Sequence, residues 1–417
     1  MEKLTAFVSQ HLSEDTARLI LNRDKWPGID MDLAVNCIES RRKLRGKVQE
    51  WYNEPSLVFP AKLSAEQCSS SATAAYKASF AGRIAGKEGW RIVDLTGGLG
   101  VDSWFFSRKA GKVLYNEMQS GLCEAAVHNF RTLNADNILI SCNIAEKGRI
   151  EEIAGDFGPD IIYMDPARRG EGGKKVFLIE ECTPDVLTLK EEIFSICRHI
   201  LIKLSPMADI SMVCERLGEK CREVHVVASG GECKELLIWM DREWTGEYTI
   251  SSVELPTSYP DIPEAVFEFL PSEEKNTAAQ PAGGLLGSQE NSIYLFEPGK
   301  ALMKAGCFNL IGKRFGLKKT GLSTHYYITD SEKTAAELYS FGKVFNIKRI
   351  DPLDKRSIKA AGKDFPKAGV TARNIPMTSE MLRKKLGCND GDEAHIFGLK
   401  SDTEGMLLII GHKIKKQ

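Results

Sequence analysis

Residues 91–106 constrain the fold more than any other part of the chain, because they combine a strand, a turn and a helix start. Residues 91–95 are apolar and β-prone, and residues 104–106 begin an apolar helical face. Between them lie three glycines that permit a sharp turn: Gly97, Gly98 and Gly100. In an open parallel sheet such loops lie beyond the carboxyl ends of strands, where ligands bind. The segment therefore predicts a nucleotide-binding strand–turn–helix junction.

The turn indicates which kind of nucleotide binds. A dinucleotide site needs Gly-x-Gly-x-x-Gly, so that a pyrophosphate can approach the helix N-terminus. From Gly98 the sequence gives Ser103 in place of the third glycine, and Asp102 puts a carboxylate where phosphate would lie. This disfavours a pyrophosphate and favours a ligand with an ammonium group. A tight turn without any ligand is the alternative interpretation of a glycine cluster.

This motif resembles motif I of the class I S-adenosylmethionine-dependent methyltransferases, whose cofactor carries an amino acid end and a sulfonium. The resemblance implies an α/β fold with a Rossmann-like seven-stranded core, and S-adenosyl-L-methionine as cofactor. The cofactor-binding residues that it implies in this segment are Asp94, Thr96, Gly97, Gly98, Gly100 and Asp102.

The next two expected strands end in residues suited to the nucleoside part of that cofactor. Residues 112–117 end in Glu117, whose carboxylate can accept both ribose hydroxyls, and Met118 follows it. A third strand over residues 137–143 ends at Asn143 and Ile144, which suit the edge and the face of adenine. Alone, Glu117 would be an ordinary solvated strand end, and a strand-end Asn is also common turn chemistry.

The fourth strand, residues 160–164, is followed by Asp165-Pro166 and resembles motif IV of amino-methyltransferases. In that family the Asp side chain and the carbonyl after it accept hydrogen bonds from an exocyclic amine. Here Ala167 and Arg168 replace the usual second proline and aromatic residue. A guanidinium can also stack on a base, or Arg168 and Arg169 can hold phosphate. The resemblance implies Asp165, Pro166 and Arg168 as catalytic residues; the alternative is that Asp-Pro only ends a strand.

Three further segments complete the expected sheet. Residues 200–206 predict a fifth strand with Lys203 near the same edge, which we assign to RNA binding. Residues 224–228 and 235–240 predict an antiparallel closing pair, whereas dehydrogenase sheets continue parallel. Upstream, residues 63–77 show a helix-start pattern at Ser64. We place Gln67 near the methionine end of the cofactor; a capped packing helix is the alternative.

Composition is ordinary for a multidomain globular protein: 417 residues predict two to three domains. The N-terminus lacks a signal-peptide pattern, and no apolar stretch approaches the ~20 residues of a membrane span, so we expect a cytoplasmic protein without a membrane partner. The 11 cysteines form no CxxC pair and are not grouped with the 7 histidines. They predict reduced core residues, including Cys142 and Cys197, and no metal site.

Charge is distributed unevenly along the chain. Residues 301–417 hold 22 lysines and arginines against 12 acidic residues, whereas the first 300 hold 34 against 45. A basic module on an acidic domain suggests a polyanionic partner, here rRNA or tRNA. The predicted contacts in this region are Arg373, Arg383, Lys384 and Lys385. A solvated lysine-rich surface is the alternative, and residues 41–47 form a second predicted basic face.

The chain divides by composition into four expected parts. These are an N-terminal helical subdomain (1–85), the methyltransferase core (86–243), a linker with a small ferredoxin-like α+β unit (244–328) and a basic domain (329–417). The last part has a strand, helix, strand, helix, strand, strand order similar to the THUMP-like domain of a bacterial family of predicted RNA methyltransferases.

The resemblances together imply RNA methylation, with guanine N2 as the expected target atom by likeness to guanine-N2 methyltransferases. The alternatives are a small-molecule or protein methyltransferase, and a non-catalytic RNA-binding protein that retains the cofactor fold. We make no prediction of the oligomeric state.

Overall fold

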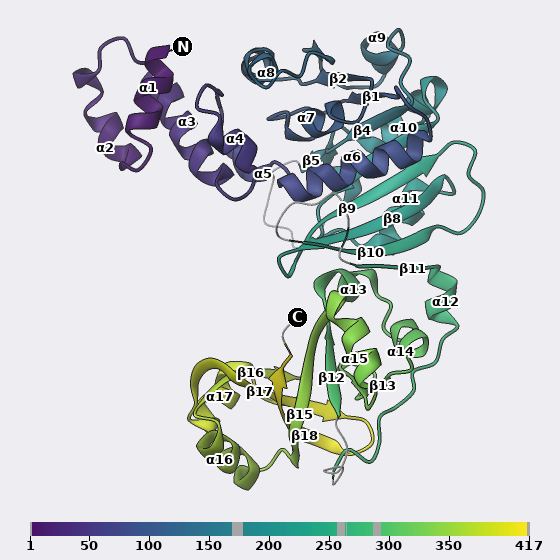
Figure 1. Cartoon of the computed structure of the whole chain (residues 1–417). Coiled ribbons are helices and arrows are strands. Elements are labelled where there is room, and N and C mark those ends of the chain that lie inside the picture. The colour runs from purple at the N-terminus through teal and green to yellow at the C-terminus, as the bar shows by residue number, and fades with distance from the viewer. Residues whose placement is uncertain (1, 169–177, 257–262, 264, 287–292, 415–417) are drawn as a thin grey trace. The chain divides into compact units, whose positions relative to one another are not determined.

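The computed structural model describes residues 2–168, 178–256, 263, 265–286 and 293–414, which form two compact units (Figure 1). Unit 1 comprises Met1–Gly230, Lys234–Tyr248 and Leu255–Pro263. Unit 2 comprises Gly231–Cys233, Thr249–Glu254 and Glu264–Gln417. The predicted boundary after residue 85 falls inside unit 1 and that after residue 328 inside unit 2, so the finer four-part division stays a prediction.

Unit 1 is built around a mostly parallel sheet. Its strands are β1 (Arg91–Asp94), β2 (Lys112–Asn116), β3 (Ile138–Ser141), β4 (Ile161–Met164), β7 (His199–Leu204), β8 (Cys221–Ser229) and β9 (Glu232–Asp241). Within the unit they lie in the order β8-β9-β7-β4-β1-β2-β3. The strands from β3 to β7 pair in parallel, and β9 is antiparallel to β7. This is the Rossmann-like core that the motif order predicts, with the antiparallel hairpin that distinguishes it from a dehydrogenase sheet.

Helices cover this sheet (Figure 1). Those that follow strands are α7 (Val101–Ser107), α8 (Ser120–Thr132), α9 (Ile150–Ala154), α10 (Val186–Ile196) and α11 (Ile210–Leu217). A short two-stranded piece, β5 (Ala167–Arg168) with β6 (Cys182–Thr183), follows β4, and a 3-10 turn (Ile179–Glu181) precedes β6.

The N-terminal helices are α1 (Glu2–Gln10), α2 (Thr16–Leu21), α3 (Met31–Leu44), α4 (Gln49–Asn53), α5 (Lys62–Gln67) and α6 (Ser71–Ala85), with a 3-10 turn at Arg23–Lys25. The predicted helix start at Ser64 is wrong, because α5 already begins at Lys62. The capped start lies instead at Ser70, which forms a reciprocal capping box with Thr73. Because α6 packs against α7 and β4, it is part of the core rather than of the preceding helices.

The glycines of the turn after β1 are required by close packing. A Cβ added at Gly97 would lie 2.1 Å from the Tyr115 ring, and one at Gly100 would lie 2.7 Å from Phe130. Gly100 also has a φ of 91°, which side chains other than glycine rarely adopt. The loop therefore lies directly on β2 and α8, and this contact holds it at the end of the sheet.

Two sequence expectations for unit 1 need correction. Of the predicted basic face at residues 41–47, Arg42, Lys43 and Arg45 are exposed, but Arg41 is buried and donates to the carbonyls of Tyr52 and Leu57, among others. Its guanidinium replaces backbone partners that the short helix α4 and the following turn leave unpaired. Cys142 is exposed just after β3, whereas Cys197 is buried as expected.

Unit 2 contains a second sheet, of order β13-β14-β12-β15-β18-β17-β16. Its strands are β12 (Tyr294–Pro298), β13 (Lys318–Lys319), β14 (Tyr327–Thr329), β15 (Gly342–Pro352), β16 (Lys367–Arg373), β17 (Asn389–Ser401) and β18 (Gly405–Lys413). The antiparallel pair β10 (Thr249–Leu255) and β11 (Ala265–Phe269) precedes them. The helices are α12 (Pro271–Lys275), α13 (Lys300–Ala305), α14 (Leu310–Phe315), α15 (Glu332–Glu337), α16 (Lys355–Asp364) and α17 (Ser379–Leu386), with a 3-10 turn at Leu338–Ser340.

The order from β15 to β18 matches the predicted strand, helix, strand, helix, strand, strand pattern. Successive side chains of β18 point to opposite faces of this sheet, and both faces are buried. Leu407 and Ile409 enter one core cluster, while Leu408 and Ile410 enter another with residues of α16 and α17. None of the helices in the described ranges is long and apolar enough to cross a membrane.

Candidate active site

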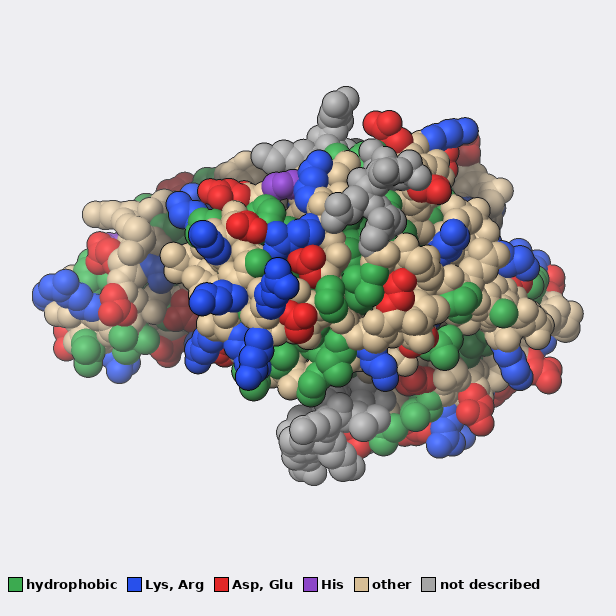
Figure 2. All heavy atoms as spheres, turned by 90° about the horizontal axis from the view of Figure 1, so that it is seen from below, with side chains coloured by type: hydrophobic (Ala, Val, Ile, Leu, Met, Phe, Trp, Pro, Cys, Tyr) green, Lys and Arg blue, Asp and Glu red, His purple; other side chains and the backbone are tan. Residues whose placement is uncertain are grey.

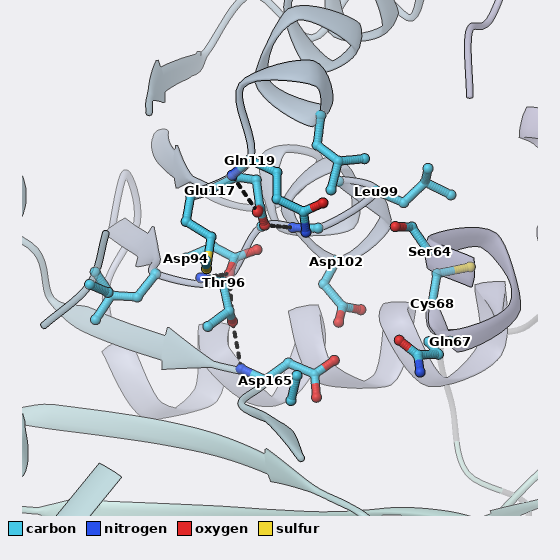
Figure 3. A pocket seen from close by; sticks show the side chains of 18 of the residues that line it. Ser64, Gln67, Cys68, Asp94, Thr96, Leu99, Asp102, Glu117, Gln119 and Asp165 are labelled. Carbon is cyan, nitrogen blue, oxygen red and sulfur yellow. Dashed lines mark hydrogen bonds between the residues drawn. The ribbon is translucent and has the colours of Figure 1, made fainter. Parts of the chain in front are cut away.

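The loops after β1, β2, β3 and β4 surround a cavity of about 220 Å³ in unit 1 (Figure 3). It lies at the carboxyl ends of parallel strands, where ligand sites form in such sheets. Every residue that the sequence assigns to the cofactor lines it: Gln67, Asp94, Thr96, Gly97, Gly98, Gly100, Asp102, Glu117, Met118, Asn143, Ile144 and Asp165. The structure thus brings together residues from five separate segments, and their individual roles stay predictions.

Asp94, the last residue of β1, holds the loop together. Its carboxylate accepts hydrogen bonds from the Thr96 backbone N–H at 3.0 Å and from the Ser103 hydroxyl at 2.7 Å. Burial raises the pKa of Asp94 to about 7, although these hydrogen bonds act in the opposite direction. The Thr96 hydroxyl in turn accepts the backbone N–H of Asp165 at 2.6 Å, which ties the ends of β1 and β4 together.

Glu117 closes the other side of the cavity. Its carboxylate accepts the backbone N–H groups of Gly98 and Gln119, each at 2.9 Å. In Figure 3, Glu117 and Asp165 lie on opposite sides of the hollow, with Asp102 between them. Two apolar side chains at this end are unusually exposed, Met118 at 58% and Ile144 at 49%. A flat apolar ring can cover both, which suits the adenine site that the sequence predicts there.

Asp102 belongs to a buried charge cluster that the sequence analysis missed. It accepts hydrogen bonds from Tyr163 at 2.8 Å and Ser69 at 3.0 Å, and Lys77 Nζ lies 3.3 Å from its Oδ1. Burial acts to raise the pKa of Asp102, but the positive charge of Lys77 and these hydrogen bonds hold it below its usual value. Lys77 is fully buried and also donates to both carboxylate oxygens of Glu235, at 2.8 and 2.9 Å.

Lys77 could have been found in the sequence. It shares one face of the Ala-rich helix α6 with Phe80, Ala81 and Ile84, at spacings of three, four and seven residues, and charged residues are almost never fully buried without a partner. Glu235 likewise stands at the start of the apolar run of β9. A lysine on an apolar helix face and an acid at the edge of an apolar strand together predict a buried pair.

Asp165 and Lys203 form a second acid–lysine pair. Lys203 Nζ donates to Asp165 Oδ2 at 2.5 Å, and its side chain is only 12% exposed. Burial lowers the pKa of Lys203, but the carboxylates of Asp165, Asp102 and Glu235 outweigh it and hold the ammonium form. The sequence assigns Lys203 to RNA binding, which stays a prediction; in the structure its ammonium group contacts the expected catalytic carboxylate, because β7 carries it next to the end of β4.

A second cavity opens on the other side of Asp165. It shares Gln67, Ser69, Asp165 and Ala167 with the first cavity. Its remaining lining includes Pro166, Lys203, Ser205 and Glu235, together with Lys47 and Lys234. Asp165 therefore stands where the two cavities meet.

The predicted RNA contacts lie in different settings. Arg168 is in β5, but its side chain is outside the described residues, as is the whole of Arg169. Arg373 is partly occupied: it donates to the Thr324 carbonyl at 3.1 Å and its guanidinium lies 4.2 Å from the centre of the Tyr326 ring.

The basic triplet Arg383, Lys384 and Lys385 forms the last turn of α17. Arg383 pairs with Asp390 at 2.9 Å and Lys384 with Glu380 at 3.3 Å. Figure 2 views the molecule from the side on which α16 and α17 lie in Figure 1, and shows many Lys and Arg side chains among acidic ones. The triplet is therefore in an exposed, mixed-charge environment.

Comparisons with known proteins identify the family. Residues 294–335 match a family described as a ferredoxin-like domain, and residues 342–413 match one described as THUMP domain-like. A crystal structure described as a putative methyltransferase from Porphyromonas gingivalis W83 is 30% identical, covers 99% of this chain and 98% of its own, and superposes with a TM-score of 0.84. The chain belongs to this family of methyltransferases with a THUMP-like domain.

Two other solved structures match a smaller part of this chain. A putative rRNA-methylase from Clostridium thermocellum is 16% identical over 40% of this chain and 96% of its own, with a TM-score of 0.30. An rRNA methylase from Streptococcus thermophilus is 13% identical over 40% and 93%, with a TM-score of 0.29. No curated protein matches the chain.

Proposed function

We propose that this protein transfers the methyl group of S-adenosyl-L-methionine to an RNA nucleophile held beside Asp165. The observation that carries the proposal is the position of Asp165, on the wall shared by the two cavities. A carboxylate there borders both reactants of a methyl transfer. Holding two reactants in line can itself supply ~7 to 11 kcal/mol of the barrier for ideal alignment, so no covalent intermediate with the protein is required.

The first cavity suits this cofactor in three ways. Its glycine turn packs closely on Tyr115 and Phe130, so that the backbone of the turn lines the cavity. Met118 and Ile144 offer an apolar surface for adenine, and Glu117 lies where a ribose would need acceptors. Asp94 and Asp102 add carboxylates to the lining, which suit a cationic sulfonium and ammonium. When bound, the cofactor would supply an electrophilic methyl group.

RNA is the proposed substrate class because the THUMP-like match lies in the basic part of the chain. Lys384 and Lys385 are exposed on α17, where cations can meet phosphate. A small-molecule or protein methyltransferase would not need that basic region. A base amine, with guanine N2 as the expected atom, is the target that the motif IV resemblance favours, since Asp165 and the Pro166 carbonyl can both accept.

Two measurements test the proposal together. Calorimetry should show S-adenosylmethionine or its demethylated product binding, with little affinity for NAD. The protein should also transfer radiolabelled methyl groups to total RNA isolated from a strain that lacks it. Binding of NAD without binding of S-adenosylmethionine would overturn the cofactor assignment. Cofactor binding with labelling of protein extract or small molecules, and none of RNA, would support the rival methyltransferase classes instead.

A chain that binds both cofactor and RNA but transfers nothing would support the non-catalytic alternative. Removing residues 301–417 separates the remaining cases, because a small-molecule enzyme should keep its activity and an RNA enzyme should lose it. The folding of the shortened chain must be checked by circular dichroism in the same experiment.

A further inference from the structure

The second cavity presents a carboxylate and an ammonium group side by side to whatever enters it. Lys203 Nζ lies 2.5 Å from Asp165 Oδ2, and both residues line the cavity. No described residue donates to Asp165 Oδ1, and the Asp165 side chain is 37% exposed. A group that binds beside this pair therefore meets the Oδ1 acceptor and the donor hydrogens of Lys203 next to each other, while Pro166 and Glu235 also line the cavity.

Hydrogen-bond complementarity distinguishes the nucleophiles that suit such a pair. The nitrogen of an exocyclic base amine only donates, because its lone pair is delocalised or attacks the methyl group, so only the ring atoms of the base, and not the attacking atom, can accept from Lys203. A hydroxyl donates one hydrogen and has two lone pairs. It can donate to Asp165, accept from Lys203 and still direct the second lone pair towards the methyl group.

The residues that line the second cavity also favour a hydroxyl nucleophile. The described residues that line it include no aromatic side chain. Nucleobases that are held for chemistry are usually stacked between aromatic or apolar side chains. The lining contains the hydroxyl-bearing residues Ser69, Ser70, Thr73 and Ser205, the lysines Lys47, Lys203 and Lys234, and the apolar residues Pro166, Ala167, Leu204 and Met207. Such walls suit a sugar flanked by phosphates better than a stacked base.

We infer that the nucleophile is a ribose hydroxyl of RNA rather than a base amine. Asp165 accepts the proton of this hydroxyl, and Lys203 orients the hydroxyl by donating a hydrogen bond to its oxygen. The inference rests on the proposed function and deepens it. The hydroxyl oxygen forms a bond to the methyl carbon while the carbon–sulfur bond breaks, and the electron pair of that bond stays on sulfur. The hydroxyl proton passes to Asp165 and from there to water.

The buried pair behind the cavity supports this arrangement. Glu235 lines the cavity and is held by Lys77, which also lies 3.3 Å from Asp102. Carboxylates and ammonium groups therefore alternate from Glu235 through Lys77 to Asp102. Such a preorganised array fixes the field around a reacting proton without having to reorganise during the step. Glu235 and Lys77 act here as positioning residues.

The test uses the full chain, deuterium-labelled S-adenosylmethionine and total RNA from a strain that lacks the protein. After digestion to nucleosides, mass spectrometry locates the label on the ribose or on the base fragment. We expect it on the ribose, together with a new alkali-resistant linkage in the RNA. Label on the base would overturn this inference and leave RNA methylation intact. No label in RNA at all would overturn the proposed function and this inference with it.

Variants then test the assigned pair. Lys203→Met should lower kcat by about 100-fold, within the usual range for proton-transfer groups, and should leave cofactor affinity within a few fold. Lys203→Arg should recover part of the loss, because it keeps a donor next to Asp165. Lys112→Met is the matched control, since Lys112 is exposed at the opposite end of β2. Full activity in folded Lys203→Met would overturn the role of the pair.

Discussion

The lysines beside the cavities of unit 1 and those on α17 of unit 2 carry the same charge in opposite surroundings. The Lys77 side chain is 0% exposed and its partner Glu235 3% exposed. On α17, the Lys384 side chain is 77% exposed and its partner Glu380 80% exposed. The first pair is fixed by its surroundings, whereas the second is surrounded by water and ions.

This difference separates two ways of using charge. Removing one partner of a buried pair typically costs ~3 to 5 kcal/mol, because the other charge is left unpaired. An exposed pair is worth ~0 to 1 kcal/mol and is screened by salt. In unit 1 each buried charge therefore fixes the position of its partner. In unit 2 single charges matter little, and only their sum can attract a polyanion.

The largest effect is expected at Asp165. Asp165→Ala should reduce kcat by about 1,000-fold, since proton-transfer groups contribute about 100- to 10,000-fold. Cofactor affinity should change only a few fold, because Asp165 borders the cofactor cavity without closing it. Single-turnover methylation of RNA and calorimetry with the demethylated cofactor measure the two quantities separately.

Asp165→Asn is the matched control for this prediction. It keeps one acceptor oxygen and nearly the same volume, so it should retain more activity than the alanine variant. Full activity of Asp165→Ala on RNA would remove this residue from the reaction.

The second largest effect concerns stability. Lys77→Met should lower the free energy of unfolding by about 3 to 5 kcal/mol, because it leaves Glu235 and Asp102 without their buried cation. Denaturant unfolding followed by fluorescence measures it. The double variant Lys77→Met with Glu235→Leu should recover part of the loss. If the losses in free energy of unfolding from Lys77→Met and Glu235→Leu simply add in the double variant, the two side chains do not act as a pair.

Much of unit 1 could be predicted because its loops carry local chemical signatures. The glycine turn, the acid after β2 and Asp165-Pro166 each follow an apolar strand, and parallel strands bring such ends to one edge of a sheet. Every predicted cofactor residue accordingly lines one cavity.

The sequence analysis missed what depends on contacts between distant segments. Lys77 and Glu235 are 158 residues apart. The apolar surroundings of each indicate that both are buried with a partner, but not that the two are partners of each other. Lys203 looked like a phosphate contact because strand position alone does not say which neighbour a side chain faces. Arg41 looked exposed because a basic run usually is, whereas its guanidinium satisfies buried carbonyls.

A third, smaller effect links pH to cofactor binding. Burial raises the pKa of Asp94 to about 7, so the carboxyl is mostly protonated below pH 7 and ionised above it. A cationic ligand favours the ionised form, so binding should strengthen as pH rises through 7 and weaken as it falls. Between pH 6 and pH 8 we expect about a tenfold gain. Calorimetry at several pH values should show this dependence, and Asp94→Asn should flatten it. An unchanged pH dependence in that variant would assign the effect to another group.

The smallest effect per residue is expected for the basic triplet of α17. Replacing Arg383, Lys384 and Lys385 together with glutamine should weaken RNA binding severalfold. It should leave cofactor affinity and the free energy of unfolding nearly unchanged, because Lys384 and Lys385 are exposed, Arg383 is partly exposed, and their ion pairs are screened. Filter binding at several salt concentrations measures the effect.

The salt dependence decides what the triplet does. Each phosphate contact contributes about 0.7 to 0.9 to the slope of log affinity against log salt, so losing all three should flatten it by about 2 to 3. Lys318→Gln, which removes one exposed lysine outside α17, is the control and should change the slope by at most about 1. An unchanged slope in the triple variant would mean that these residues are only solvated. The RNA surface would then have to be sought on the basic face at residues 41–47, where Arg42, Lys43 and Arg45 are exposed although Arg41 is buried.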